Sequence, residues 1–81
     1  MIQREIAVYD KKTEKLKFSI PLAIPDEILF SYYKECTKED PCLYYCYDIY
    51  EGDVPFYKAY VPKDFEFDFE KDDYQLECCA V

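Results

Sequence analysis

The chain has 81 residues, a hydrophobic share of 51% and a formal net charge of −8, and it contains no histidine. This length suits one domain, residues 1–81, and the apolar and aromatic content excludes an intrinsically disordered chain. No stretch is long and apolar enough for a membrane span, and the first residues lack the pattern of an export signal. We therefore expect a cytoplasmic protein.

The charge is unevenly spread along the chain. Residues 1–38 carry seven basic and six acidic side chains, whereas residues 39–81 carry three lysines and twelve carboxylates, a net of −9. Such a field repels nucleic acid and membranes and attracts a basic protein partner. The alternative is a solvated acidic surface that serves only solubility.

The first two elements are strands in the prediction. Apolar and polar side chains alternate over residues 2–9 and again over residues 15–20, and a polar turn at residues 10–14 joins them as an antiparallel hairpin. Pro21 ends the second strand because it has no N–H for the ladder. Pro25, Asp26 and Glu27 then begin a helix. Its predicted buried stripe consists of Ile28, Leu29, Tyr32, Tyr33 and Cys36, and Phe30 lies off it.

Residues 42–50 are aromatic or apolar on both faces of an extended chain, which predicts an interior strand covered on both sides. Residues 53–61 fit a short helix or a strand, and Pro55 favours the helix. Residues 65–70 alternate strictly between phenylalanine and a carboxylate, which predicts an extended segment whose charges protect a sheet edge. Residues 74–81 predict a last strand with Tyr74, Leu76, Cys78 and Ala80 facing inward.

The expected fold class is therefore α+β, a small single domain in the order strand, strand, helix, strand, short helix, strand, with a mainly antiparallel sheet. Catalytic chemistry finds little support in this sequence. The absence of histidine removes the usual general base, and the single glycine offers no phosphate-binding loop. We expect no enzyme activity, no cofactor and no metal site.

The candidate site is acidic and binds a partner protein. Carboxylates gather at the end of the predicted interior strand and in the last third of the chain, beside tyrosines and phenylalanines, a composition typical of an anchor for a basic protein. The predicted partner-binding residues are Asp48, Glu51, Asp53, Asp64, Glu66, Asp68, Asp72 and Asp73.

Three stretches carry a family resemblance: Val-Tyr-Asp-Lys-Lys-Thr-Glu-Lys-Leu at residues 8–16, Tyr-Cys-Tyr-Asp-Ile at residues 45–49, and Asp-Asp-Tyr-Gln-Leu-Glu-Cys at residues 72–78. With its size and acidity, the chain resembles bacterial immunity proteins of polymorphic-toxin and contact-dependent growth inhibition systems. The resemblance implies a stoichiometric inhibitor that binds and neutralises a cognate basic toxin, with a nuclease as the expected toxin. The rival interpretation is an acidic nucleic-acid mimic that blocks a DNA- or RNA-binding protein. A small accessory domain with unremarkable acidity is a third.

The five cysteines generate the first prediction. Cys36, Cys42, Cys46, Cys78 and Cys79 are an odd number in a chain without a predicted export signal, and their spacing matches no zinc motif. All five should therefore react with a thiol reagent in denaturant without reductant. Recovery of an intact disulfide from protein made in a reducing cytosol, or of one zinc ion per chain, would contradict this.

Overall fold

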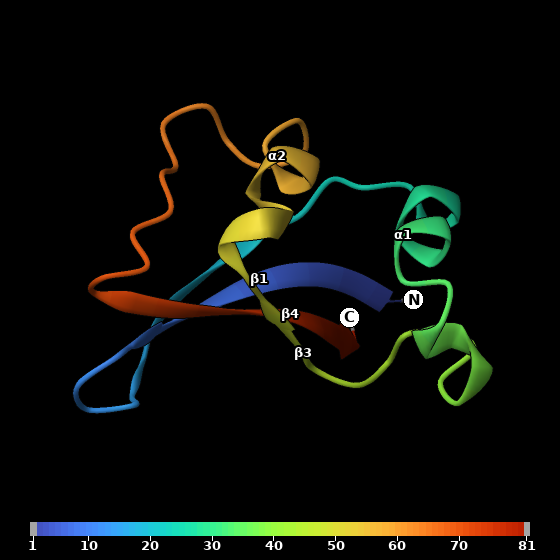
Figure 1. Ribbon diagram of the computed structural model, residues 1–81, viewed down its shortest axis with the longest axis horizontal. Helices are drawn as coiled ribbons and strands as arrows, with labels where there is room; N and C mark the ends of the chain where they lie inside the picture. The colour runs from blue at the N-terminus through green and yellow to red at the C-terminus, as the bar shows by residue number, and fades with distance from the viewer. Residues whose placement is uncertain (1, 81) are drawn as a thin grey trace.

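The computed structural model describes residues 2–80, which build a four-stranded antiparallel sheet with short helices. The strands are β1 (Ile2–Asp10), β2 (Leu16–Pro21), β3 (Tyr47–Ile49) and β4 (Asp72–Ala80), in the order β2-β1-β4-β3 across the sheet. The helices are α1 (Asp26–Tyr32) and α2 (Val54–Tyr57), with 3-10 turns η1 (Cys36–Lys38) and η2 (Glu51–Asp53). Figure 1 shows this arrangement, which confirms the predicted α+β class and the order of elements.

The two central strands come from opposite ends of the chain. β1 and β4 pair antiparallel along their whole length, nine residues each. Their period-two alternation places Ile6 and Val8 of β1 beside Leu76 and Tyr74 of β4 on one buried face. The predicted hairpin of β1 and β2 and the predicted last strand are both confirmed. The side chain of Ala80, predicted to face inward, lies outside the described residues.

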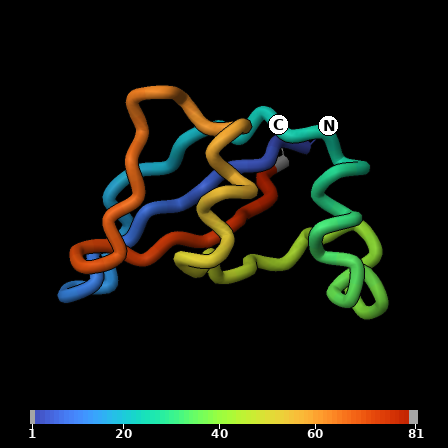
Figure 2. Tube along the Cα trace, turned by 45° about the horizontal axis from the view of Figure 1, so that its top comes forward, coloured from blue at the N-terminus to red at the C-terminus, as the bar shows by residue number. Residues whose placement is uncertain are grey.

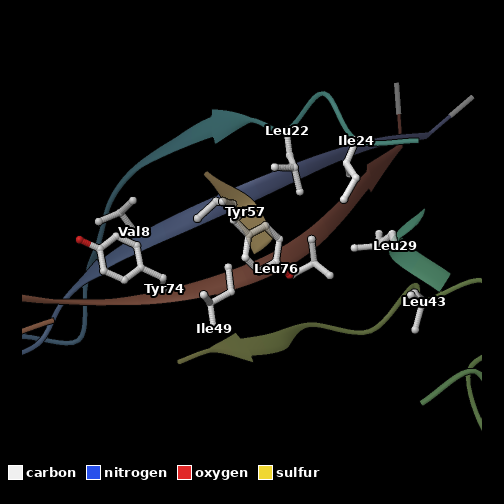
Figure 3. Close-up of a cluster of buried hydrophobic side chains, with 10 residues drawn as sticks. Val8, Leu22, Ile24, Leu29, Leu43, Ile49, Tyr57, Tyr74 and Leu76 are labelled. Carbon is white, nitrogen blue, oxygen red and sulfur yellow. The ribbon is translucent and has the colours of Figure 1, made fainter. Parts of the chain in front are cut away.

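The covering layer lies on one face of the sheet, where α1, α2 and residues 62–71 cross it (Figures 1 and 2). Figure 3 shows the core that results, in which Tyr57 of α2 lies beside Leu76 of β4 and Leu29 of α1 lies beside Leu43. Because α1 has only seven residues, it buries Leu29 alone fully. The predicted helical stripe is only partly correct. Ile28 and Tyr32 are exposed, and Phe30, predicted off the stripe, packs against the core.

Residues 42–50 do not form an interior strand, so that prediction is wrong. β3 covers only Tyr47–Ile49 and lies at the edge of the sheet, with β4 as its strand partner. Tyr44, Tyr45 and Tyr50 on its two flanks are 55%, 66% and 67% exposed. Their aromatic character looked like burial in the sequence, but these rings project from an irregular loop and from the strand end.

Two sets of polar contacts, one from distant Arg4 and one from nearby Asp40, explain why residues 40–46 leave the sheet. The buried guanidinium of Arg4, 4% exposed, donates to the carbonyl oxygens of Leu43 and of Cys42, the latter at 2.7 Å. The Asp40 carboxylate accepts the N–H groups of Tyr44 at 3.0 Å and of Tyr45 at 2.9 Å. These bonds satisfy the backbone as well as a strand ladder would, so the loop is stable without pairing.

The same carboxylate also anchors the beginning of β3. The hydroxyl of Tyr47 donates to Asp40 at 2.7 Å. Burial raises the pKa of the Asp40 carboxyl, but the backbone and hydroxyl hydrogen bonds that it accepts outweigh that effect and hold the pKa below its usual value. Asp40 is therefore ionised at neutral pH and links the loop to the edge strand.

Two further predictions are settled by the second half of the chain. The short helix at residues 53–61 is confirmed as α2, with Pro55 in its first turn. Residues 65–68 have no regular secondary structure and residues 69–71 form a turn, so the prediction of an extended segment over residues 65–70 is wrong for its end. Among the described residues they pair with no strand and so protect no sheet edge. They cross over the sheet instead. Phe65, Phe67 and Phe69 pack on Tyr74 with ring centroids 6.1, 4.8 and 5.0 Å from it.

Arg4 generates the second prediction. Arg4→Met keeps much of the side-chain volume but leaves the buried carbonyl of Leu43 and the partly buried carbonyl of Cys42 without this donor. Urea denaturation should therefore show a loss of about 3 kcal/mol in the free energy of unfolding. Asp26→Ala is the control, because Asp26 is half-exposed and lies 3.6 Å from Arg4 Nε. It should lose less than about 1 kcal/mol. Equal losses in the two variants would mean that the guanidinium does not hold the loop.

Candidate functional site

Two adjoining grooves cross the surface where β3, η2 and residues 65–70 meet. The first groove holds about 750 Å³ and the second about 600 Å³. The first groove is lined by Tyr9, Lys11, Glu14, Asp48, Ile49, Tyr50, Glu51, Phe69, Asp73, Tyr74 and Gln75. The second groove is lined by Glu51, Val54, Pro55, Lys58, Phe65, Glu66, Phe67, Asp68, Phe69 and Glu70. Glu51 and Phe69 line both, so the two grooves form one continuous acidic surface.

Five of the eight predicted acidic residues line these grooves. Asp48 and Asp73 lie in the first groove, Glu66 and Asp68 in the second, and Glu51 in both. Each groove contains four carboxylates and one lysine. The structure therefore brings together acids from two separate stretches of the sequence into one site.

Glu51 owes its position to the turn after β3. The Asp53 carboxylate accepts the Tyr50 N–H at 2.9 Å, and the Asp53 N–H donates to the Tyr50 carbonyl at 2.9 Å. This closes η2 immediately after the strand and turns Glu51 to the surface. The hydroxyl of Tyr32 also donates to Asp53, at 2.6 Å, and so joins α1 to the same turn.

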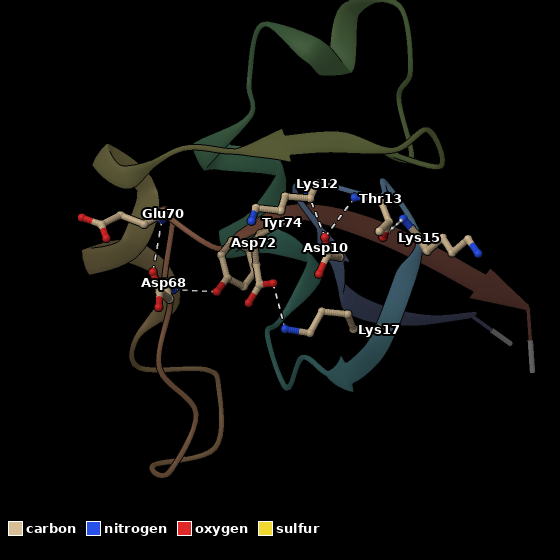
Figure 4. A network of polar contacts seen from close by, with 9 residues as sticks. All are labelled: Asp10, Lys12, Thr13, Lys15, Lys17, Asp68, Glu70, Asp72 and Tyr74. Atoms are coloured by element: carbon tan, nitrogen blue, oxygen red, sulfur yellow. Dashed lines mark hydrogen bonds and ion pairs between the residues drawn. The ribbon is translucent and has the colours of Figure 1, made fainter.

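The phenylalanine–carboxylate alternation positions the acids of the second groove. With the three rings turned to the core, the intervening carboxylates face outward, and Glu66 and Glu70 are exposed. Figure 4 shows how Asp68 is fixed between them. Its N–H donates to the Tyr74 hydroxyl at 2.6 Å, and its carboxylate accepts the Glu70 N–H at 3.1 Å.

The hairpin between β1 and β2 contributes residues that the sequence analysis missed. Tyr9, Lys11 and Glu14 line the first groove. Lys11 lies 3.8 Å from Asp73 and donates to the Phe69 carbonyl, so it partly neutralises that end of the groove. Only the pairing of β1 with β4 brings the hairpin here, and nothing in the local sequence of the turn signals it.

Tyr9 is a neutral hydrogen-bonding group at the floor of this region. Its hydroxyl donates to Glu77 at 2.7 Å. That bond, with smaller contributions from burial and the nearby negative charge, raises the pKa of Tyr9 to about 12. The phenol therefore adds no charge to the groove at physiological pH.

Three predicted residues lie outside the grooves. Asp53 closes η2, as described, and Asp64 is exposed in the turn that precedes residues 65–70. Asp72 is 8% exposed, and its carboxylate lies 2.9 Å from Lys17 Nζ of β2 (Figure 4). The prediction of Asp72 as an accessible binding residue is therefore wrong, because a strand distant in sequence supplies its cation. That hydrogen bond also raises the pKa of Lys17.

The chemistry of the grooves is that of a receptor for cations. Carboxylates accept hydrogen bonds from guanidinium and ammonium groups, and an exposed tyrosine ring can lie against a cationic side chain. Tyr50, 67% exposed beside Asp48 and Glu51, supplies such a ring.

Among residues 2–80, no group of three or more potential ligands is arranged to hold a metal ion. Within the same residues, no helix has the length and apolarity to cross a bilayer.

Comparison with known protein families assigns the chain to a family. Residues 3–77 match a family described as a domain of unknown function, DUF7683, and the chain belongs to that family. The match covers β1 to β3 and most of β4, so the whole groove region lies within the family domain. Searches among curated proteins and among solved structures return no match.

Neighbouring Asp72 and Asp73 give the third prediction. Asp72→Asn removes the charge that pairs with Lys17 in a largely buried setting and should lower the free energy of unfolding by about 1–2 kcal/mol. Asp73→Asn, at an exposed position of the first groove, should change it by no more than about 0.5 kcal/mol. Chemical denaturation of both variants at neutral pH checks this. Equal stability of the two would show that the Lys17 pair contributes nothing.

Proposed function

We propose that this protein is a stoichiometric inhibitor that binds a basic toxin domain, in the manner of an immunity protein, through its two acidic grooves. The observation that carries the proposal is the convergence of Asp48, Glu51 and Asp73 with Glu66 and Asp68 on one surface. Carboxylates that share a surface give it a negative potential, and like charges on it repel one another in the free protein. A partner that supplies lysine or arginine relieves that repulsion on binding.

The aromatic composition of the grooves supports a protein as the partner. Phe69 lines both grooves and Tyr50 is exposed beside Glu51, so apolar area adjoins the charge. Interfaces between proteins depend on a few aromatic anchors within a polar rim. A toxin, and a nuclease in particular, is the partner that the family resemblance implies, since a nuclease needs a basic cleft for its substrate.

The nucleic-acid mimic is the rival hypothesis, and it uses the same charge differently. A mimic depends on the number and spacing of carboxylates and little on any single aromatic ring. Tyr50→Ser leaves the charge unchanged and so separates the two. An inhibitor with an aromatic anchor should lose affinity, whereas a mimic should not.

Charge reversal gives the fourth prediction. Glu51→Lys with Glu66→Lys changes two groove residues, and the candidate partner to test is a basic protein encoded by an adjacent gene. Association should slow by roughly tenfold or more at low salt, because steering depends on the local field. The difference should shrink as salt rises, since the screening length falls to about 3 Å at 1 M. Stopped-flow binding at two salt concentrations measures this.

The matched control is Glu35→Lys with Glu39→Lys. Both residues are exposed and line neither groove. Because each double variant reverses two acidic residues, the control has the same net charge as the groove variant. Its association should slow by less than about threefold, and it should still protect cells that express the partner. If both double variants slow association equally, net charge alone attracts the partner and the grooves are not the binding surface.

A further inference from the structure

The outer edge of β3 is open. β3 is the last strand in the order β2-β1-β4-β3, and β4 is its strand partner on the inner side. Among residues 2–80, both views show no other segment beside its outer side (Figures 1 and 2). An open edge presents backbone N–H and C=O groups that another extended chain can pair with.

The register of the sheet fixes which backbone groups point outward. The Leu22 N–H donates to the Arg4 carbonyl at 3.0 Å, so the even-numbered residues of β1 bond toward β2 and the odd-numbered residues toward β4. The Lys11 N–H, which donates to the Lys71 carbonyl at 3.0 Å, continues the odd set toward the chain that enters β4.

The same alternation continues across β4 to β3. Gln75 pairs with Ala7 and therefore bonds toward β1, so its neighbours on β4 bond toward β3. Those neighbours pair with Tyr47 and Ile49. Asp48, between them, has its N–H and its C=O directed away from β4, to the open side.

The turn after the strand limits this edge. The N–H and the C=O of Tyr50 are both bonded to Asp53 and are not free for a partner. The free backbone pair at Asp48 is flanked by the exposed rings of Tyr45 and Tyr50. A short edge of this kind discourages pairing with arbitrary strands and favours one whose side chains also fit.

The charges beside the edge identify the side chains that fit. Asp48 itself, Glu51 and Asp73 line the first groove next to β3. We propose that the β3 edge receives an extended segment of the basic partner, which adds to the sheet as a fifth strand and places lysine or arginine side chains against these carboxylates. This inference rests on the proposed function, and adds to it the geometry with which the partner binds.

The opposite edge of the sheet does not fit such a segment. On β2 the residues that point outward include Pro21, which has no N–H to offer. Lys15 and Lys17 on and beside that strand would repel a basic chain. The two edges therefore differ in both hydrogen bonding and charge, and only β3 combines a free backbone pair with carboxylates.

The test uses a synthetic peptide of four Lys-Val repeats as the probe and compares Asp48→Pro with Asp48→Asn. Both variants lose the carboxylate charge, but only the proline removes the outward N–H. The proline breaks no backbone hydrogen bond to β4, but it also loses the bond that Gln75 Nε2 donates to the Asp48 side chain at 3.2 Å, which the asparagine can keep. We expect the peptide to bind Asp48→Pro at least tenfold more weakly than Asp48→Asn. On the wild-type protein it should slow hydrogen exchange of the Asp48 amide at least tenfold, as measured by NMR.

A peptide of four Glu-Val repeats and a Lys-Val peptide N-methylated at every residue are the probe controls, and neither should protect the Asp48 amide. If Asp48→Pro does not fold, the test rests on the wild-type protein alone, and the Lys-Val peptide must slow hydrogen exchange of the Asp48 amide for strand addition to stand. Equal binding to the two variants without protection overturns strand addition and leaves the acidic grooves as the binding surface. If about 1 mM Lys-Val peptide gives no binding, strand addition is overturned. The proposed function falls with it only if the basic neighbour also fails to bind.

Discussion

The buried guanidinium of Arg4 is the contact on which the site depends. It reaches from the first strand to the backbone of Cys42 and Leu43 and holds the loop that leads into β3. Burial of a charge is unfavourable unless hydrogen bonds compensate it. The loop carbonyl groups accept from the two terminal nitrogens of Arg4, whereas the buried Nε has no hydrogen-bond partner among the described residues and lies 3.6 Å from the Asp26 carboxylate. If that loop moved, β3 and the turn at Glu51 would move with it, because β3 is short and lies at the edge.

The acidic half of the chain shows two different uses of a carboxylate. Some carboxylates stabilise the fold: those of Asp40 and Asp53 accept backbone N–H groups, and that of Asp72 pairs with Lys17. The groove carboxylates make few such bonds, and each groove has only one lysine among its lining residues. The unevenness matters for function, because uncompensated charge on an ordered surface attracts a complementary partner more strongly than the same charge spread over the molecule.

Much of the fold follows from local patterns. The hairpin and the last strand alternate with a period of two, and Pro55 distinguishes a helix from a strand, so these elements could be predicted. The strand at residues 42–50 could not be predicted correctly. Its tyrosines look buried by composition. Tyr44 and Tyr45 are held out of the sheet by Asp40 and by Arg4, and Arg4 is 38 and 39 positions away from the carbonyl groups that it bonds. Hydrophobic periodicity carries no information about such contacts.

The candidate site, like the fold, could be predicted from the sequence only where local patterns decide it. Charge and aromatic alternation identified Glu51, Glu66 and Asp68, which are exposed or half-exposed for local reasons. The sequence could not distinguish buried Asp72 from exposed Asp73, because Lys17, the cation that pairs with Asp72, lies on β2. Likewise Glu14 enters the first groove only through the register of β1 on β4.

The central claim is that the acidic grooves are the binding surface. The most direct measurement is an NMR chemical-shift map of the labelled protein, titrated with a candidate partner, a basic protein encoded by an adjacent gene. The account predicts the largest shifts at residues 48–51 and 66–70, with the hairpin turn affected only where Lys11 and Glu14 line the first groove. Shifts centred on β2 and Lys15, with the grooves unchanged, would contradict it.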